Sequence, residues 1–112
     1  MDDYTGTTPS VLKIFGETYD VDTWAETLTT AVTRILRDVD DPGRVTEIEG
    51  RTRTYFAGEG QQSELVKPQK ISGTDLYLET NFSANTVVRT IERVMDKYEY
   101  DRAELEIFTE ED

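Results

Sequence analysis

The sequence contains neither cysteine nor histidine among its 112 residues. The lack of cysteine excludes disulfide bonds and thiol nucleophiles, and the lack of both residues excludes Cys/His zinc sites. Without histidine, the chain can form no Ser-His-Asp triad and has no histidine acid–base chemistry. No apolar run approaches the ~18 residues of a membrane helix. We therefore expect a cytoplasmic protein with no membrane contact, no cofactor and no metal site.

Basic residues are scarce, since 12 Lys+Arg stand against 24 Asp+Glu and give a formal charge of −12. At molar salt, where the Debye length is about 3 Å, such self-repulsion is largely screened. This composition predicts a salt-adapted, halophilic-type protein, with an ordinary acidic protein or a partner-mimicking acidic surface as the alternative. Only residues 44–70 depart from the trend, with five basic and four acidic residues.

The hydrophobic pattern predicts an α+β domain at residues 10–112, preceded by a frayed N-terminus at residues 1–9. The apolar runs 11–15 and 18–21 favour a hairpin, with Gly16 in a type II′ turn. A helix is expected after the capping box of Thr23 and Glu26. Its apolar stripe continues to Val39, and the sequence Asp-Pro-Gly at residues 41–43 ends it.

The second half of the chain adds further strand patterns at residues 51–57, 75–80 and 103–108, and a second amphipathic helix starting at Ser83. Residues 65–72 are ambiguous, because Pro68 restricts them to an edge strand or an extended segment. The predicted order is β-β-α-β-β-α-β. It favours one mostly antiparallel sheet with two amphipathic helices packed on one face.

The segment Glu79–Asn85 is the first candidate binding site, because a strand runs directly into a helix N-terminus there. Free backbone N–H groups and the helix dipole favour polar or anionic ligands at such a corner. The neutral side chains that would add hydrogen-bonding groups there are those of Thr80, Asn81, Ser83 and Asn85. The structural alternative is that Ser83 caps the helix and Asn81 forms a turn.

The second candidate site is the predicted strand Arg51–Phe56, in which basic and aromatic residues alternate with threonine. Strand alternation would put Arg51, Arg53 and Tyr55 on one face, where they could stack bases and hold phosphates, with Lys70 nearby in the sequence. The alternative is that Phe56 belongs to the core and the arginines pair with surface carboxylates.

Catalytic chemistry finds little support in the sequence. Paired acids such as Asp40 and Asp41 could bind Mg²⁺ or Ca²⁺ loosely, but none has the spacing of a calcium loop. No nucleophile, base and oxyanion-stabilising set can be assembled. We therefore predict no catalytic residues, and a carboxylate-dependent metal hydrolase is the weakest alternative.

The stretch from Pro68 to Arg89 carries a resemblance to a known type of module. Its Pro-Gln-Lys-Ile and Gly-Thr lead, its Glu-Thr-Asn strand end and its Ser-Ala-Asn helix start, together with Arg-Thr-Tyr-Phe at residues 53–56, are similar to a small uncharacterised module. That module occurs at the C-terminal ends of restriction- and defence-associated bacterial and archaeal proteins. The resemblance implies a non-catalytic accessory domain that acts near nucleic acid or in an assembly. The acidic composition also resembles that of small uncharacterised haloarchaeal proteins.

The sequence thus favours a non-enzymatic interaction module whose partner is an unknown protein or a second copy paired at the edge strand around Pro68. Nucleic-acid binding through the strand Arg51–Phe56 is the alternative. Both hypotheses use the same candidate binding residues, which are Arg51, Arg53, Tyr55, Lys70, Asn81, Ser83 and Asn85.

Overall fold

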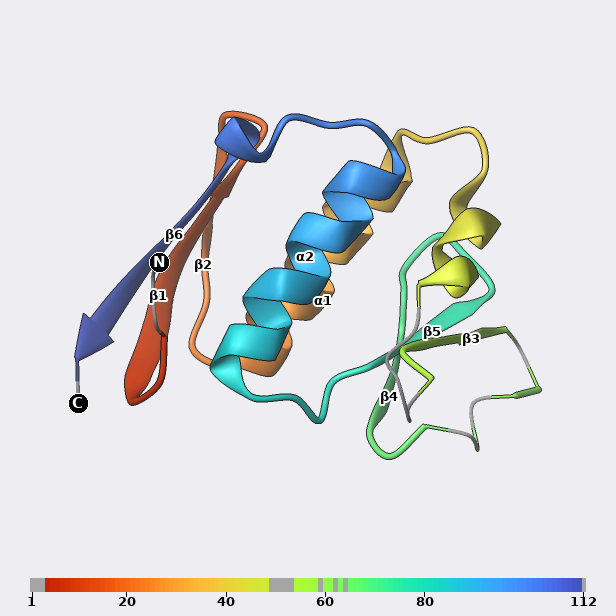
Figure 1. Cartoon of the computed structure of the whole chain (residues 1–112), viewed down its shortest axis with the longest axis horizontal. Helices are drawn as coiled ribbons and strands as arrows, with labels where there is room; N and C mark the ends of the chain where they lie inside the picture. Colours follow the sequence, from red (N-terminus) through yellow and green to blue (C-terminus); the bar gives the residue numbers. More distant parts are fainter. Residues whose placement is uncertain (1–3, 49–53, 59, 62, 64, 112) are drawn as a thin grey trace.

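The computed structural model describes residues 4–48, 54–58, 60–61, 63 and 65–111. Two helices lie in the middle of the molecule, with one small antiparallel sheet on either side of them (Figure 1). This arrangement confirms the predicted α+β class. The prediction of a single sheet was wrong, because the strands divide into two three-stranded sheets.

The first sheet has the order β2-β1-β6. Strand β1 (Thr7–Ile14) pairs with β2 (Glu17–Asp20) on one side and with β6 (Leu105–Glu111) on the other, both antiparallel. The β1–β2 turn has positive φ at both central residues, 53° at Phe15 and 78° at Gly16. This is the pattern of a type I′ turn, so the expected type II′ turn was wrong. The ring of Phe15 packs against Tyr100 at 4.8 Å between centroids.

Residues 4–9 are ordered in the structure, whereas residues 1–3 of the segment expected to be frayed lie outside the described residues. Strand β1 begins at Thr7, which pairs with Glu111 of β6, and Tyr4 packs edge-on against Trp24 at 5.4 Å between ring centroids. The indole N–H of Trp24 donates to the carbonyl of Thr7 at 3.0 Å. Pairing with a distant strand and contact with an aromatic side chain therefore order residues that lack any periodic pattern of their own.

The second sheet has the order β3-β5-β4. Its strands are short: β3 (Phe56–Gly58), β5 (Leu76–Glu79) and β4 (Pro68–Lys70). All three residues of β4 are exposed and the strand lies at the sheet edge, which agrees with the effect expected of Pro68. Phe56 is buried, as the structural alternative for the central segment expected.

The helices α1 (Trp24–Arg37) and α2 (Ala84–Lys97) contact each other and fill the space between the sheets. The N-cap role of Thr23 is confirmed, since its hydroxyl accepts from the Glu26 N–H at 3.0 Å. The return bond differs from that of a capping box, because the Glu26 carboxylate accepts from the N–H of Asp22, at 2.6 Å, one residue before the cap. At 3.6 residues per turn, the buried positions of each helix cover roughly half of its circumference. Such wide apolar faces explain why the helices pack between two sheets rather than on one. These buried positions are Thr27, Leu28, Ala31, Val32, Ile35 and Leu36 in α1, and Val87, Val88, Thr90, Ile91, Val94 and Met95 in α2.

Two 3₁₀ helices, η1 (Pro42–Glu47) and η3 (Arg102–Glu104), complete the described elements. Helix η1 begins within the Asp-Pro-Gly sequence at residues 41–43, with Asp41 as its N-cap and Pro42 as its first residue. It buries Val45, and Glu47 forms an ion pair with Lys97 near the end of α2. Among the described residues, no helix combines the length and the apolar character needed to span a bilayer.

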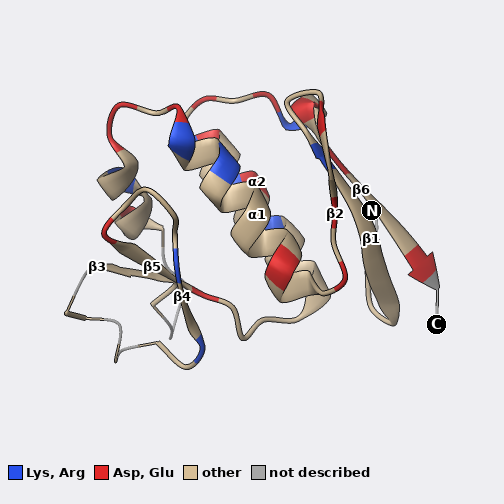
Figure 2. Ribbon diagram, turned by 180° about the vertical axis from the view of Figure 1, so that it is seen from behind, with Lys and Arg blue, Asp and Glu red and all other residues tan. Residues whose placement is uncertain are grey.

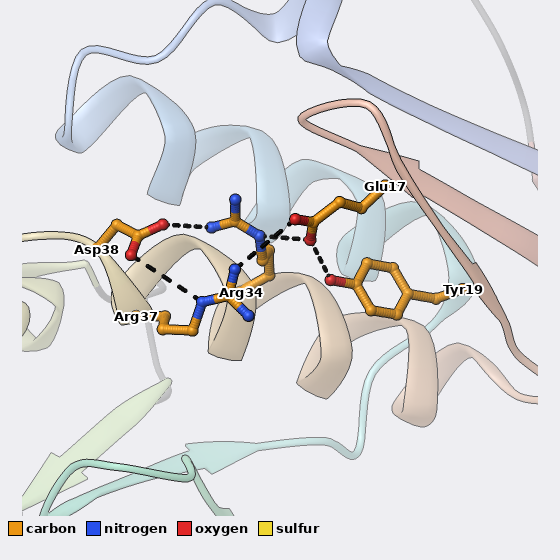
Figure 3. A network of polar contacts seen from close by, with 5 residues as sticks. All are labelled: Glu17, Tyr19, Arg34, Arg37 and Asp38. Atoms are coloured by element: carbon orange, nitrogen blue, oxygen red, sulfur yellow. Dashed lines mark hydrogen bonds and ion pairs between the residues drawn. The ribbon is translucent and has the colours of Figure 1, made fainter.

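A polar network fastens the β1–β2 hairpin to α1 (Figure 3). The carboxylate of Glu17 accepts from the Tyr19 hydroxyl at 2.5 Å and from Nε of Arg34 at 2.7 Å, and Arg34 also pairs with Asp38 at 2.8 Å. The hydrogen bonds from Tyr19 and Arg34 lower the pKa of Glu17 below its ordinary value. This network therefore stabilises the ionised form of Glu17 and joins the first sheet to the helix pair.

Candidate nucleic-acid interface

The strand-to-helix corner predicted from the sequence is present between the end of β5 and the start of α2. Residues 80–83 connect the two elements, and Ser83 is the N-cap of α2. The Ser83 hydroxyl accepts from the Thr86 N–H at 3.3 Å and donates to the Thr86 hydroxyl at 3.0 Å. The capping role that the sequence left open for Ser83 is thus confirmed, and its hydroxyl remains at the exposed edge of the corner.

A buried carboxylate holds the backbone of the corner in place through hydrogen bonds. Strand alternation places Glu79 on the same face of β5 as Tyr77, and its side chain is only 1% exposed. Its carboxylate accepts four backbone N–H groups, from Val66 at 2.8 Å, Lys67 at 2.9 Å, Thr80 at 3.0 Å and Asn81 at 3.1 Å. Multiple hydrogen bonds of this kind offset the cost of burying a carboxylate. We call this arrangement the Glu79 clamp.

The two asparagines of the corner differ in their surroundings. Asn81 has an exposed side chain, and its backbone N–H is held by the Glu79 clamp. Asn85 lies in the first turn of α2, where its side chain accepts from the Tyr4 N–H at 2.8 Å and donates to the Thr5 hydroxyl at 3.2 Å. Asn85 therefore ties the N-terminal segment to α2, and its role in ligand binding stays a prediction.

The structure brings the central segment and the corner together, which the sequence left undetermined. The backbone carbonyl of Tyr55 accepts from the Glu79 N–H at 2.8 Å. The ring of Tyr55 meets that of Phe82 edge-on at 4.7 Å, and the Arg93 guanidinium lies 5.9 Å from the Tyr55 ring centre. Tyr55 is half-buried in this cluster. Arg51 and Arg53, the other members of the predicted face, lie outside the described residues.

The part of the sequence that contains the corner is less acidic than the rest of the chain. Residues 51–93 contain six basic and five acidic residues, whereas the rest of the chain contains six basic and 19 acidic residues. Lys67 precedes β4, Lys70 ends it, and Arg89 lies on α2; all three are exposed. Strand β4 and the acidic end of β6 lie on opposite sides of the helix pair (Figure 2). Lys67 adjoins the corner directly, because its backbone carbonyl accepts from the Thr80 N–H at 3.1 Å.

The weakest alternative, a metal hydrolase, gains no support from this geometry. Within the part of the chain that the structure describes, no three acidic side chains gather in a group that could hold a metal ion. The acids nearest to the corner include Glu79, whose carboxylate is taken up by backbone N–H groups.

These features define a small α+β domain with a polar, exposed corner braced by a buried carboxylate and adjoined by basic residues. The family model described as the SeqA protein C-terminal domain matches residues 28–111, and the chain belongs to this family. The family consists of DNA-binding domains related to replication. No curated protein and no solved structure was found that matches the chain significantly.

The family match corrects two expectations from the sequence. The resemblance to modules of restriction- and defence-associated proteins was wrong, because the matching residues, including the corner and the central segment, belong to the SeqA C-terminal domain family. The interpretation as a halophilic, acidic interaction module, and with it the likeness to haloarchaeal proteins, was wrong for the same reason. The match supports the nucleic-acid alternative better than the interaction module that the composition favoured.

Proposed function

We propose that this chain is a non-catalytic domain that binds duplex DNA through the strand-to-helix corner. The observation that carries the proposal is the family match, which spans the corner, β4 and the central segment. A DNA-binding role also agrees with the cytoplasmic location expected from the sequence. Self-association or a protein partner is an additional hypothesis that the family match does not address.

Each exposed group at the corner suits a different part of a duplex. The carboxamide of Asn81 can form two hydrogen bonds with an adenine edge in the major groove. The hydroxyl of Ser83 and the N–H groups in the first turn of α2 suit a phosphate oxygen. Lys70 supplies a positive charge for the DNA backbone, and Tyr55 would support the corner through Phe82. Arg51 and Arg53 stay predicted phosphate or base contacts.

Binding can be measured by fluorescence anisotropy on a labelled duplex at several salt concentrations. Asn81→Ala should cost about 1–3 kcal/mol of binding free energy, because it removes a base contact. Lys70→Gln should weaken binding and reduce the salt slope by about one, because it removes a phosphate contact. The control is Lys13→Gln, which makes the same charge change at an exposed position of β1.

We expect the Lys13→Gln variant to bind the duplex with the same affinity as the parent protein. The proposal is contradicted if the parent protein shows no saturable binding to duplex DNA at about 0.1 M salt, where even non-specific complexes of DNA-binding proteins form. Equal losses in the Lys70 and Lys13 variants would contradict the assignment of the binding face.

A further inference from the structure

The segment Leu65–Lys67 lies beside the corner although it is more than ten residues away in the sequence. The Glu79 clamp accounts for this position, since two of its N–H donors come from Val66 and Lys67 and two from Thr80 and Asn81. One buried carboxylate thus fixes two surface segments relative to each other. Neither the corner prediction nor the family match assigns a role to this second segment.

Hydrogen bonds fix both the backbone N–H and the backbone carbonyl of Lys67. Its N–H donates to the Glu79 carboxylate at 2.9 Å, and its carbonyl accepts from the Thr80 N–H at 3.1 Å and from the Thr80 hydroxyl at 2.8 Å. The side chain of Lys67 is exposed. A positive charge is therefore presented from a defined point directly next to Thr80 and Asn81.

Val66 presents an apolar side chain from the same rigid segment. It is 65% exposed, while the preceding Leu65 is 7% exposed and anchors the segment in the interior. The Val66 N–H donates to the Glu79 carboxylate at 2.8 Å, so its backbone position is fixed. Among the described residues, the only other large hydrophobic side chain with high exposure is Phe108 of β6. The exposed valine therefore lies in the rim of the polar corner.

We propose that Val66 and Lys67 form a second DNA-contacting element, with Lys67 on a phosphate and Val66 on an apolar group of the duplex. We further propose that Glu79 is the positioning residue that holds this element at a fixed position relative to Asn81. The inference rests on the proposed function. The apolar group is a thymine methyl or the carbon face of a deoxyribose, since both are accessible from a groove.

The first test is Val66→Ala, measured by anisotropy on a duplex with thymine and on the same duplex with uracil in its place. Loss of two buried methyl groups predicts about tenfold weaker binding to the thymine duplex. Phe108→Ala is the matched control, because it shortens the other exposed hydrophobic side chain, and it should bind like the parent protein.

The uracil duplex distinguishes the two apolar groups. If Val66 contacts a thymine methyl, the parent protein binds the uracil duplex more weakly and Val66→Ala shows no further loss. If Val66 contacts a deoxyribose, the parent protein binds both duplexes equally and Val66→Ala is weakened on both. Either pattern supports the contact. Parent-like affinity of Val66→Ala on the thymine duplex would overturn it.

The second test addresses Lys67 and its positioning by Glu79. Lys67→Gln should reduce the salt slope of binding by about one. Glu79→Gln should cause a similar reduction, because an amide cannot accept all four N–H groups of the clamp. In the Glu79→Gln background, Lys67→Gln should cause no further reduction of the salt slope, because the lysine is already displaced from its phosphate contact. If Glu79 had only a structural role, the reductions in salt slope caused by Lys67→Gln and Glu79→Gln would be additive.

These outcomes separate this inference from the proposed function. If the parent protein fails to bind duplex DNA, the proposed function fails. If the parent protein binds and both Val66→Ala and Lys67→Gln bind like it, the second contact element is refuted while the proposed function stands. Additive effects of Lys67→Gln and Glu79→Gln would refute the positioning role. Should Glu79→Gln not fold, Glu79→Asp takes its place in the same cycle, since it keeps the charge but withdraws the carboxylate from the N–H groups.

Discussion

At the scale of single residues, the carboxylates of this chain differ in the groups to which they are hydrogen-bonded. Glu79 is buried and holds backbone groups, whereas Glu17 is partly exposed and holds side chains from a strand and a helix. Asp96 pairs with Arg102, and this hydrogen bond lowers the pKa of Asp96. An acidic composition thus includes residues with specific structural partners, and their effects can be tested one at a time.

Glu17 makes a testable contribution to stability that depends on pH. Because the pKa of Glu17 is lowered in the folded protein, its contribution is present above the ordinary value of 4.5 and is lost as the pH falls through the folded pKa. Glu17→Gln should therefore lower Tm at pH 7, and the difference from the parent protein should shrink toward pH 3. The measurement is thermal unfolding followed by circular dichroism across this pH range.

The control for this prediction is Asp20→Asn, an exposed acid on the same strand. It removes the same charge without touching Arg34 or Tyr19, so it should not reproduce the fall in Tm. A Glu17→Gln variant as stable as the parent protein at pH 7 would contradict the role of the network in Figure 3.

At the scale of elements, the sequence predicted the helices better than the sheets. Helical caps and stripes are local signals, so the caps Thr23 and Ser83 were assigned correctly from their neighbours. Strand pairing depends on distant residues, and nothing local indicates that β6 pairs with β1 rather than with β5. The same limit applies to Glu79, because the Val66 and Lys67 N–H groups that its carboxylate binds come from a segment more than ten residues away in the sequence.

Strand β1 should be essential to the fold although it lies outside the residues that match the family. Leu12 is fully buried between Tyr19 of β2 and Ile107 of β6, at the centre of the first sheet. Leu12→Ala should lower the free energy of unfolding by about 2–5 kcal/mol, the usual cost of removing a buried leucine side chain. Urea unfolding at neutral pH measures the change.

Val11→Ala is the matched control, because Val11 is the neighbouring residue on the opposite, half-buried face of the same strand. It makes a comparable change in strand propensity and should cost clearly less than Leu12→Ala. Equal and small effects of both substitutions would mean that the first sheet contributes little to the core.

At the scale of the whole molecule, charge is distributed unevenly. The first sheet carries one basic residue, Lys13, while the segments around the corner hold Lys67, Lys70 and Arg89. The sequence revealed this contrast as a less acidic central region, and of the candidate residues that it named in that region the structure brings Tyr55 next to the corner. It did not reveal the Glu79 clamp or the position of Val66, because both depend on chain segments brought together only by folding.

We propose that the corner, with the segments beside it, is the DNA-binding surface of the molecule. The most direct measurement is an NMR titration of the isotope-labelled protein with duplex DNA at moderate salt, following each backbone amide. We expect saturable shifts at residues 65–70 and 80–85, and little change in β1, β2 and β6. A flat titration of a folded sample, or shifts confined to the first sheet, would contradict the proposal.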